Sequence, residues 1–111
     1  MAAKLTTHAL DTMRGRGAAG MRVGLARLSP SPADLGSVAL DDGGRGVLAE
    51  GLEPGAYELL FEIGAYQRGE GLEGDLFIDQ APVRFSIAAD LAHYHVPILI
   101  NPYGYCVYRG G

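Results

Sequence analysis

The sequence predicts an all-β protein, a β-sandwich of seven or eight short strands with at most one short helix. Apolar and polar residues alternate over several short segments, and Gly, Pro and Asp gather between those segments. Alternation with period two is typical of strands that bury one face, and closely spaced turn signals are typical of a sandwich. The chain has 111 residues and no linker or internal repeat, so residues 1–111 are expected to form a single domain.

The first half of the chain has the features of strands separated by turns. Threonines and alternating leucines mark the first strand, and a glycine-containing loop follows it over residues 11–20. Ser-Pro-Ser-Pro at 29–32 and Asp-Asp-Gly-Gly at 41–44 read as turns by their residue types. Strands are therefore expected over residues 4–10, 21–28 and 35–40.

The second half begins with a turn at Glu53-Pro54-Gly55 and the most regular alternation of the middle of the chain. Over residues 56–63 the larger apolar side chains share one face, namely Tyr57, Leu59, Phe61 and Ile63. Four glycines and no clear period follow, with a short helix near Tyr66 as the one helical candidate. Residues 83–88 alternate again and predict a further strand.

The last nineteen residues predict a β-hairpin with chemically distinct faces. Residues 93–100 and 103–108 are rich in β-branched and aromatic residues, and Asn101-Pro102 is a turn signal between them. Period two places His93, His95, Pro97 and Leu99 on one face, and the apolar Tyr94, Val96, Ile98 and Ile100 on the other. The apolar face is expected to pack in the core. Pro97 has no N–H to donate, so it is expected at a bulge or an unpaired position.

The net charge, the apolar runs and the cysteine content limit the kinds of partner that the protein can bind and the places in the cell where we expect it. The net charge of −4 argues against nucleic acid, and no apolar run approaches the roughly 20 residues that span a membrane. We see no apolar secretory segment at the start of the sequence. The single Cys106 cannot form an internal disulfide, and we expect it to be packed rather than reactive. These features favour the cytoplasm.

Three histidines carry the candidate chemistry, and all three fall in predicted strands. Neutral imidazoles transfer protons well near pH 7, and His8 and His95 can meet if their strands share a sheet face. Arg45, directly after a turn, would supply positive charge for an anionic substrate. The same histidines allow a competing arrangement, a three-histidine zinc site with an open position.

Several stretches together resemble the transthyretin-like family, over nearly the whole chain. The similarity is strongest in Leu-Thr-Thr-His-Ala-Leu-Asp-Thr at 5–12, Asp-Gly-Gly-Arg at 42–45, His-Tyr-His-Val-Pro at 93–97, Pro-Tyr-Gly-Tyr at 102–105 and Tyr-Arg-Gly at 108–110. The histidines and the Tyr-Arg-Gly ending resemble the enzymatic branch, which hydrolyses 5-hydroxyisourate. The hormone-binding transthyretins lack both features.

The resemblance implies a transthyretin-like sandwich that assembles as a homotetramer, a dimer of dimers with active sites in a channel. The implied reaction is hydrolysis of the lactam ring of 5-hydroxyisourate to 2-oxo-4-hydroxy-4-carboxy-5-ureidoimidazoline, a step from urate to allantoin. No cofactor or metal is implied. By the matching motifs, the catalytic residues are His8, Arg45 and His95, and the substrate-binding residues are Tyr108, Arg109, Gly110 and Gly111.

Some points stay open at the level of sequence. Gly111 stands where the family usually has serine, and Cys106 where serine or threonine is common. Either His8 or His95 could accept the proton from water. His93 could be a structural residue or could support the active-site residues, and the sequence favours neither. The alternative function is a non-catalytic transthyretin-like protein that binds a small ligand in the channel.

Overall fold

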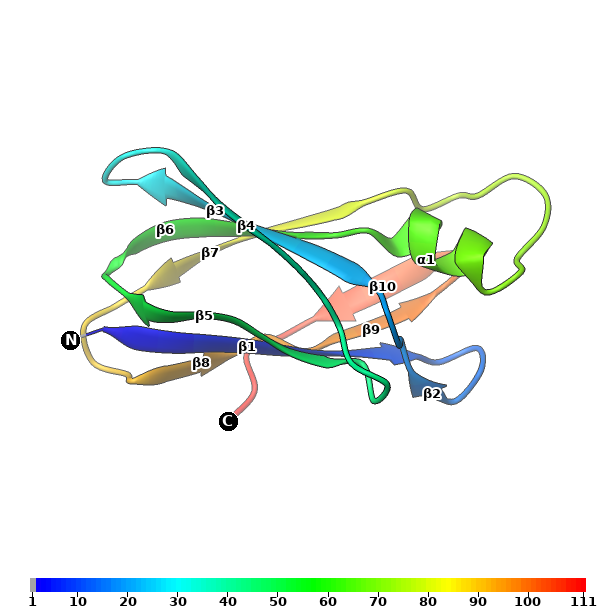
Figure 1. The fold of residues 1–111 in the computed structure, drawn as a ribbon, viewed down its shortest axis with the longest axis horizontal. Helices are drawn as coiled ribbons and strands as arrows, with labels where there is room; N and C mark the ends of the chain where they lie inside the picture. Colours follow the sequence, from blue (N-terminus) through cyan, green and yellow to red (C-terminus); the bar gives the residue numbers. More distant parts are fainter. Residues whose placement is uncertain (1) are drawn as a thin grey trace.

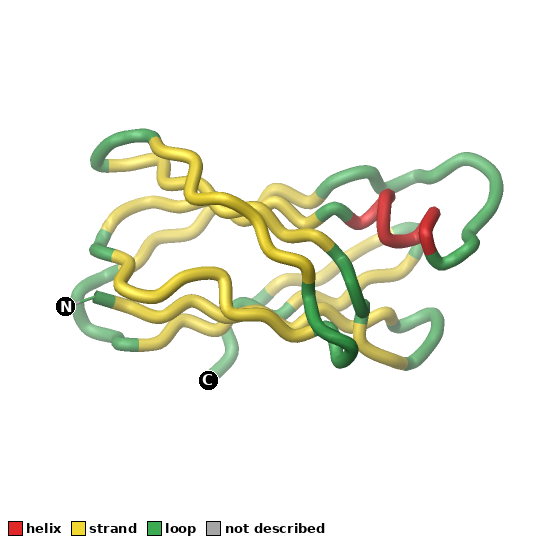
Figure 2. Tube along the Cα trace, viewed as in Figure 1, coloured by secondary structure: helices red, strands yellow, loops and turns green. Residues whose placement is uncertain are grey.

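The computed structural model describes residues 2–111, which form two β-sheets packed face to face (Figure 1). One sheet has the order β4-β3-β6-β7 and contains β3 (Arg22–Ser29), β4 (Ala33–Ala39), β6 (Gly55–Phe61) and β7 (Ala81–Ile87). The other contains β1 (Ala3–Asp11), β2 (Arg16–Gly17), β5 (Arg45–Leu52), β8 (His93–His95), β9 (Ile98–Asn101) and β10 (Gly104–Val107). Helix α1 (Ile63–Gly69) lies at one end, and the loops gather at the two ends (Figure 2). The predicted all-β sandwich is confirmed.

Strand β1 is the centre of the second sheet. On one side it pairs antiparallel with β5, and His8 stands opposite Arg45. On the other side it pairs parallel first with β8 and then with β9, so that Thr6 stands opposite His95. The first strand of the chain and its last hairpin therefore lie side by side, which brings distant candidate residues together.

The structure divides the predicted strand 93–100 in two. Strand β8 ends at His95 and β9 begins at Ile98, so Pro97 lies between strands and no ladder requires its missing N–H. The predicted position of Pro97 is confirmed. Strand β10 pairs antiparallel with β9, with Gly104 opposite Asn101, and this confirms the hairpin.

Apart from shifts of one or two residues at strand ends, three further elements differ from the sequence prediction. Strand β5 was not predicted, because Gly46 and Gly51 interrupt its alternation and register shifts interrupt its pairing with β1. The strand expected over 56–63 ends at Phe61, and Ile63 starts the helix instead. The expected loop 11–20 contains the two-residue strand β2.

Alternate residues of each sheet fill the core. The hairpin face predicted to be apolar is buried throughout, with Tyr94, Val96, Ile98 and Ile100 all at most 5% exposed. The expectation that Cys106 is packed is wrong: it pairs with Leu99, on the face opposite the core, and it is exposed. Because neighbouring strand residues point to opposite faces, Thr6, His8 and His95 are left on the outer face of the sheet.

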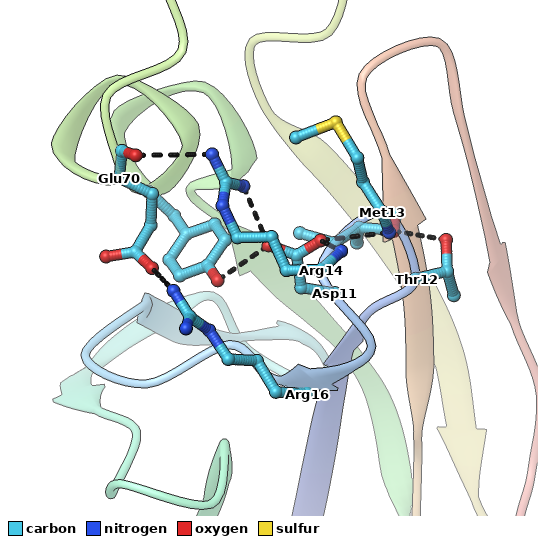
Figure 3. Close-up of polar contacts among 8 residues, drawn as sticks. Asp11, Thr12, Met13, Arg14, Arg16 and Glu70 are labelled. Atoms are coloured by element: carbon cyan, nitrogen blue, oxygen red, sulfur yellow. Dashed lines mark hydrogen bonds and ion pairs between the residues drawn. The ribbon is translucent and has the colours of Figure 1, made fainter.

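A polar network joins the end of β1 to α1 (Figure 3). The Asp11 carboxylate, 3% exposed, accepts hydrogen bonds from the Tyr66 hydroxyl at 2.8 Å and from Arg14 Nη1 at 2.9 Å. Arg16 forms an ion pair with Glu70 at 2.8 Å. Burial opposes ionisation of Asp11, but the hydrogen bonds from Tyr66 and Arg14 outweigh it and lower the pKa of this carboxyl. Burial and the bond to Asp11 raise the pKa of Tyr66 to about 12.

Replacing Tyr66 by phenylalanine is expected to lower the free energy of unfolding by about 1–3 kcal/mol, because the buried carboxylate loses a donor. Urea unfolding at pH 7 measures this difference. The folded-state pKa of Asp11 is lowered, so its stabilisation is complete above the ordinary value of 3.8 and disappears as pH falls through the lowered pKa. The effect of Tyr66→Phe should therefore shrink in acid. Tyr103→Phe is the control, since Tyr103 is 80% exposed, and an equal loss in both variants would contradict the prediction.

Among the described residues, no helix has the length and the apolar character that crossing a membrane requires.

Candidate active site

A hollow of about 620 Å³ opens on the outer face of the six-stranded sheet, and we refer to it as the histidine hollow. It contains two of the predicted catalytic residues, Arg45 and His95, and two of the predicted substrate-binding residues, Gly110 and Gly111. The remaining lining residues are Thr6, Thr7, Asp41, Gly46, Val47 and His93. Residues from β1, β5, β8 and the end of the chain thus meet in one place.

His95 is placed at the hollow by its pairing with Thr6 across β8 and β1. Its Nδ1 lies 2.8 Å from Thr6 Oγ1, and the same hydroxyl oxygen lies 2.7 Å from His93 Nε2. No described residue forms a hydrogen bond with His95 Nε2. Burial, followed by the nearby His93, His8 and Arg45, lowers the pKa of His95 below its ordinary 6.5. The imidazole is therefore neutral at pH 7 and has one nitrogen available to a ligand.

His8 lies beside the hollow without lining it. Its Nε2 donates a hydrogen bond to the carbonyl oxygen of Gly43 at 2.9 Å. Because a carbonyl oxygen only accepts, this nitrogen carries a hydrogen and is not a free base. His8 thus contacts the turn that precedes its strand partner Arg45.

The turn over residues 41–45 places Arg45. Asp41 Oδ1 accepts hydrogen bonds from the backbone N–H groups of Gly43 and Arg45, both at 2.9 Å. The Arg45 N–H, and then that of Gly43, lower the pKa of the Asp41 carboxyl despite partial desolvation. Among the described residues no acidic side chain forms an ion pair with the Arg45 guanidinium. Its charge is available to an anionic ligand.

The C-terminal segment, residues 108–111, runs along the strand end that carries His95. The Gly110 N–H donates to the His95 carbonyl at 2.7 Å, and Tyr108 N–H to the Pro97 carbonyl at 3.3 Å. A side chain at Gly110 would meet the imidazole, because its Cβ would lie 2.7 Å from His95 Cδ2. Glycine here lets the segment pass directly against the ring.

Tyr108 and Arg109 do not enter the histidine hollow of their own chain. They line a separate hollow of about 390 Å³, together with residues of β7 such as Val83 and Phe85. The four C-terminal residues that the sequence groups as substrate-binding are therefore divided between two hollows.

The described residues contain no group of three or more His, Cys, Asp or Glu side chains arranged to hold a metal ion. His93 and His95 share the Thr6 hydroxyl, and His8 is engaged by Gly43. The three histidines are therefore not arranged as the ligands of one zinc ion.

Sequence reasoning did not assign roles to Thr6 and Asp41. The signal for Thr6 was its place on the same strand face as His8, and the signal for Asp41 was its place at the head of an Asp-Asp-Gly-Gly turn. Their contacts to His95 and Arg45 depend on pairing between distant strands, which spacing alone does not give.

Comparison with known proteins gives the family. A model of the HIUase/Transthyretin family matches residues 5–110. The chain belongs to this family. Within the family it is 47% identical to a 5-hydroxyisourate hydrolase of Mesorhizobium japonicum, over 96% of this chain and 91% of that protein. It is 45% identical to 5-hydroxyisourate hydrolase 2 of Rhizobium meliloti, over 96% and 95%.

Three solved structures superpose on nearly the whole chain. The 5-hydroxyisourate hydrolase of Klebsiella pneumoniae is 32% identical with a TM-score of 0.84, covering 98% of this chain and 99% of that one. The crystal structure of (S)-allantoin synthase is 38% identical with a TM-score of 0.88, but this chain spans only 44% of its length. Sea bream transthyretin in complex with thyroxine, 20% identical with a TM-score of 0.85 and covering 96% and 93%, shows the shared fold alone.

Proposed function

We propose that this family member hydrolyses the lactam ring of 5-hydroxyisourate, giving 2-oxo-4-hydroxy-4-carboxy-5-ureidoimidazoline. One observation carries the proposal: the same hollow holds a neutral imidazole with a free nitrogen and an arginine that has no acidic partner among the described residues. The chain is also 47% identical to a protein named 5-hydroxyisourate hydrolase over nearly its full length. A base and a fixed positive charge are what water attack on a cyclic amide of an anionic substrate requires.

His95 is the proposed general base. Its free Nε2 accepts a proton from water as the water oxygen attacks the ring carbonyl, and the carbonyl oxygen becomes an oxyanion. Collapse of this intermediate breaks the C–N bond of the ring, and the leaving nitrogen takes up a proton. His8 is less suited to the base role, because its Nε2–H is already donated to Gly43.

Arg45 is proposed to orient the substrate and to stabilise the oxyanion. The turn bonds from Asp41 fix its backbone, and no described carboxylate competes for its guanidinium. His8, opposite Arg45 in the ladder, keeps the preceding Gly43 in place. The predicted catalytic residues thus divide into a base, an electrostatic group and a support for that group.

The test is the ultraviolet decay of 5-hydroxyisourate, generated in place from urate by urate oxidase, with and without this protein. A large acceleration supports the hydrolase. If the folded protein binds the substrate without accelerating its decay, the alternative applies, a transthyretin-like binding protein without catalysis.

The same assay gives a pH prediction. Protonated His95 cannot accept the proton from water, so kcat/KM is expected to fall in acid and to level off as pH rises through the lowered pKa of His95. The midpoint of this rise should lie below pH 6.5, because burial and the neighbouring His93, His8 and Arg45 lower the pKa of His95. A rate that still rises steeply above pH 7 would be inconsistent with His95 as the base.

We also propose that the protein works as a homotetramer, a dimer of dimers, as the family resemblance implies. The histidine hollow lies on an open sheet face, and Tyr108 and Arg109 lie outside it within one chain. We expect these two residues to contribute to substrate binding in the assembled protein. Light scattering after size exclusion should give four times the chain mass of 11.7 kDa, and a monomer with full activity would contradict this proposal.

We further propose a cytoplasmic location. The supporting feature is that the single Cys106 is a free, exposed thiol. Fractionation of cells that express the protein tests this, and recovery in the periplasmic or membrane fraction would reject it.

A further inference from the structure

One hydroxyl group stands between two imidazoles at the base of the histidine hollow. Thr6 Oγ1 is 2.7 Å from His93 Nε2 and 2.8 Å from His95 Nδ1, both hydrogen-bond distances. The two rings themselves lie 6.3 Å apart and tilted, so they do not contact each other directly. Thr6 is therefore the group that connects them.

Two hydrogen arrangements use the Thr6 hydroxyl hydrogen in this contact, because the hydroxyl can donate to only one imidazole while it accepts from the other. In the first arrangement Thr6 donates to His93 Nε2 and accepts from His95 Nδ1–H, which leaves His95 Nε2 bare. In the second arrangement His93 Nε2–H donates to Thr6, and Thr6 donates to His95 Nδ1, which puts the hydrogen of His95 on Nε2. The first arrangement makes His95 a base toward the hollow, and the second makes it an acid.

We propose that Thr6 is a positioning residue that couples His93 to His95, so that His95 acts first as base and then as acid within one turnover. This inference rests on the hydrolase function proposed above. It assigns a role to His93 as the group that holds the positive charge while His95 carries a hydrogen on Nε2 for the leaving nitrogen.

The proton transfers balance as follows. When water adds to the carbonyl, its proton goes to His95 Nε2, the Nδ1 proton goes to Thr6 Oγ1, and the Thr6 hydroxyl proton goes to His93 Nε2. The positive charge then resides on His93, and His95 is neutral with a hydrogen on Nε2. When the C–N bond breaks, that hydrogen goes to the leaving nitrogen, and the two transfers through Thr6 reverse. The chain returns to its starting state with one water consumed.

Burial supports this direction of charge movement. His95 is partly buried, whereas His93 is exposed at the rim of the hollow. An imidazolium is better solvated at the exposed position, and Arg45 and His8 disfavour a charge on His95. The other charged groups near the pair are Lys4, opposite His93 in the ladder, and Asp41 in the hollow lining.

Thr6→Val tests the proposal, because valine keeps the shape and removes the hydroxyl. We expect kcat to fall by about 10- to 100-fold with KM within about twofold, a smaller loss than the 10²- to 10⁴-fold expected for removal of a general base, because His95 Nε2 is still present. Thr6→Ser should recover most of the rate. Thr12→Val is the matched control: Thr12 donates to the Ile100 carbonyl at 2.8 Å, away from the hollow, and kcat should be unchanged.

Two measurements separate this role from a merely structural one. In mixtures of light and heavy water, the dependence of the wild-type kcat on the heavy-water fraction should require the transfer of more than one proton in the same step. For Thr6→Val it should require only one. Without substrate, ¹⁵N NMR of the imidazoles should place the hydrogen of His95 on Nδ1, and this preference should be lost in Thr6→Val.

The outcomes distinguish this proposal from the proposed function. If wild-type protein does not accelerate substrate decay, the hydrolase function fails, while NMR still tests the Thr6 coupling. The coupling is overturned if Thr6→Val keeps the wild-type kcat and the wild-type imidazole signals. It is also overturned if Thr6→Ser is as slow as Thr6→Val.

Discussion

His95→Asn is expected to lower kcat by about 10²- to 10⁴-fold, the range that a positioned general base contributes. Asparagine can still donate to the Thr6 hydroxyl from its amide, but it has no atom that takes a proton at the position of Nε2. KM should change much less, because Arg45 and the rest of the hollow remain. Initial rates over a range of 5-hydroxyisourate concentrations separate the two parameters.

The comparison variant is His8→Asn, for which we expect a smaller loss. Its Nε2–H is donated to Gly43, so the variant loses a hydrogen bond to the turn but no free base. Urea unfolding of both variants confirms that each is folded. If both variants keep the wild-type kcat, the assignment of the base to this pair of strands is wrong. If His8→Asn is the slower variant, the base is His8.

Gly110→Ala is expected to lower kcat by about 10²-fold, because the new methyl group would displace the His95 ring. The added Cβ would lie 2.7 Å from Cδ2, 3.4 Å from Cγ and 3.5 Å from Cβ of His95. The first distance is far below van der Waals contact, so the ring or the C-terminal segment must shift, and we expect the ring to rotate and lose its bond to Thr6. The φ angle of Gly110 lies outside the left-handed region, so alanine adds no backbone strain of its own.

Gly104→Ala provides the matched control in the same hairpin. An added Cβ there meets only Asn101 Oδ1, at 4.0 Å, and the φ angle is again not left-handed. We expect Gly104→Ala to keep kcat and the unfolding midpoint of the wild type. A shift of the His95 imidazole signals in Gly110→Ala alone would show that the ring has moved, whereas unchanged signals together with an unchanged kcat would refute the prediction.

The sequence predicted the faces of the last hairpin well, because burial follows the period-two pattern directly. The apolar set from Tyr94 to Ile100 is buried, and His93 and His95 lie on the opposite face. The break at Pro97 was also predictable, since a residue without an N–H cannot continue a ladder. Local chemistry was sufficient in these cases.

Pairing between distant strands could not be predicted in the same way. Strand β5 was missed because Gly46 and Gly51 remove the side chains that would reveal alternation. The contact of Thr6 with both imidazoles depends on the parallel register between β1 and β8. Thr6 and His95 are 89 positions apart in the sequence. Such a register is set by packing of the whole sheet and leaves no trace in local spacing.

The sequence named residues of the candidate site, but it did not show how they are placed relative to one another. Arg45, His95, Gly110 and Gly111 line one hollow, whereas Tyr108 and Arg109 line another. The C-terminal segment has a single isolated bridge, between His95 and Gly110, and no regular strand that would make its side-chain directions predictable.

The central position of β1 divides the hollow into a rigid and an adaptable half. Thr6 lies on β1, which is paired on both sides, and His95 stands directly opposite it in the β1–β8 ladder, so the two groups can separate only if that ladder opens. Gly110 and Gly111 belong to a segment with one isolated bridge, so this segment can shift while the sheet stays intact. We therefore expect changes of substrate preference from substitutions that do not crowd His95, such as at Gly111, where an added Cβ meets nothing within 4 Å, while the proton-transfer geometry of Thr6 and His95 is kept.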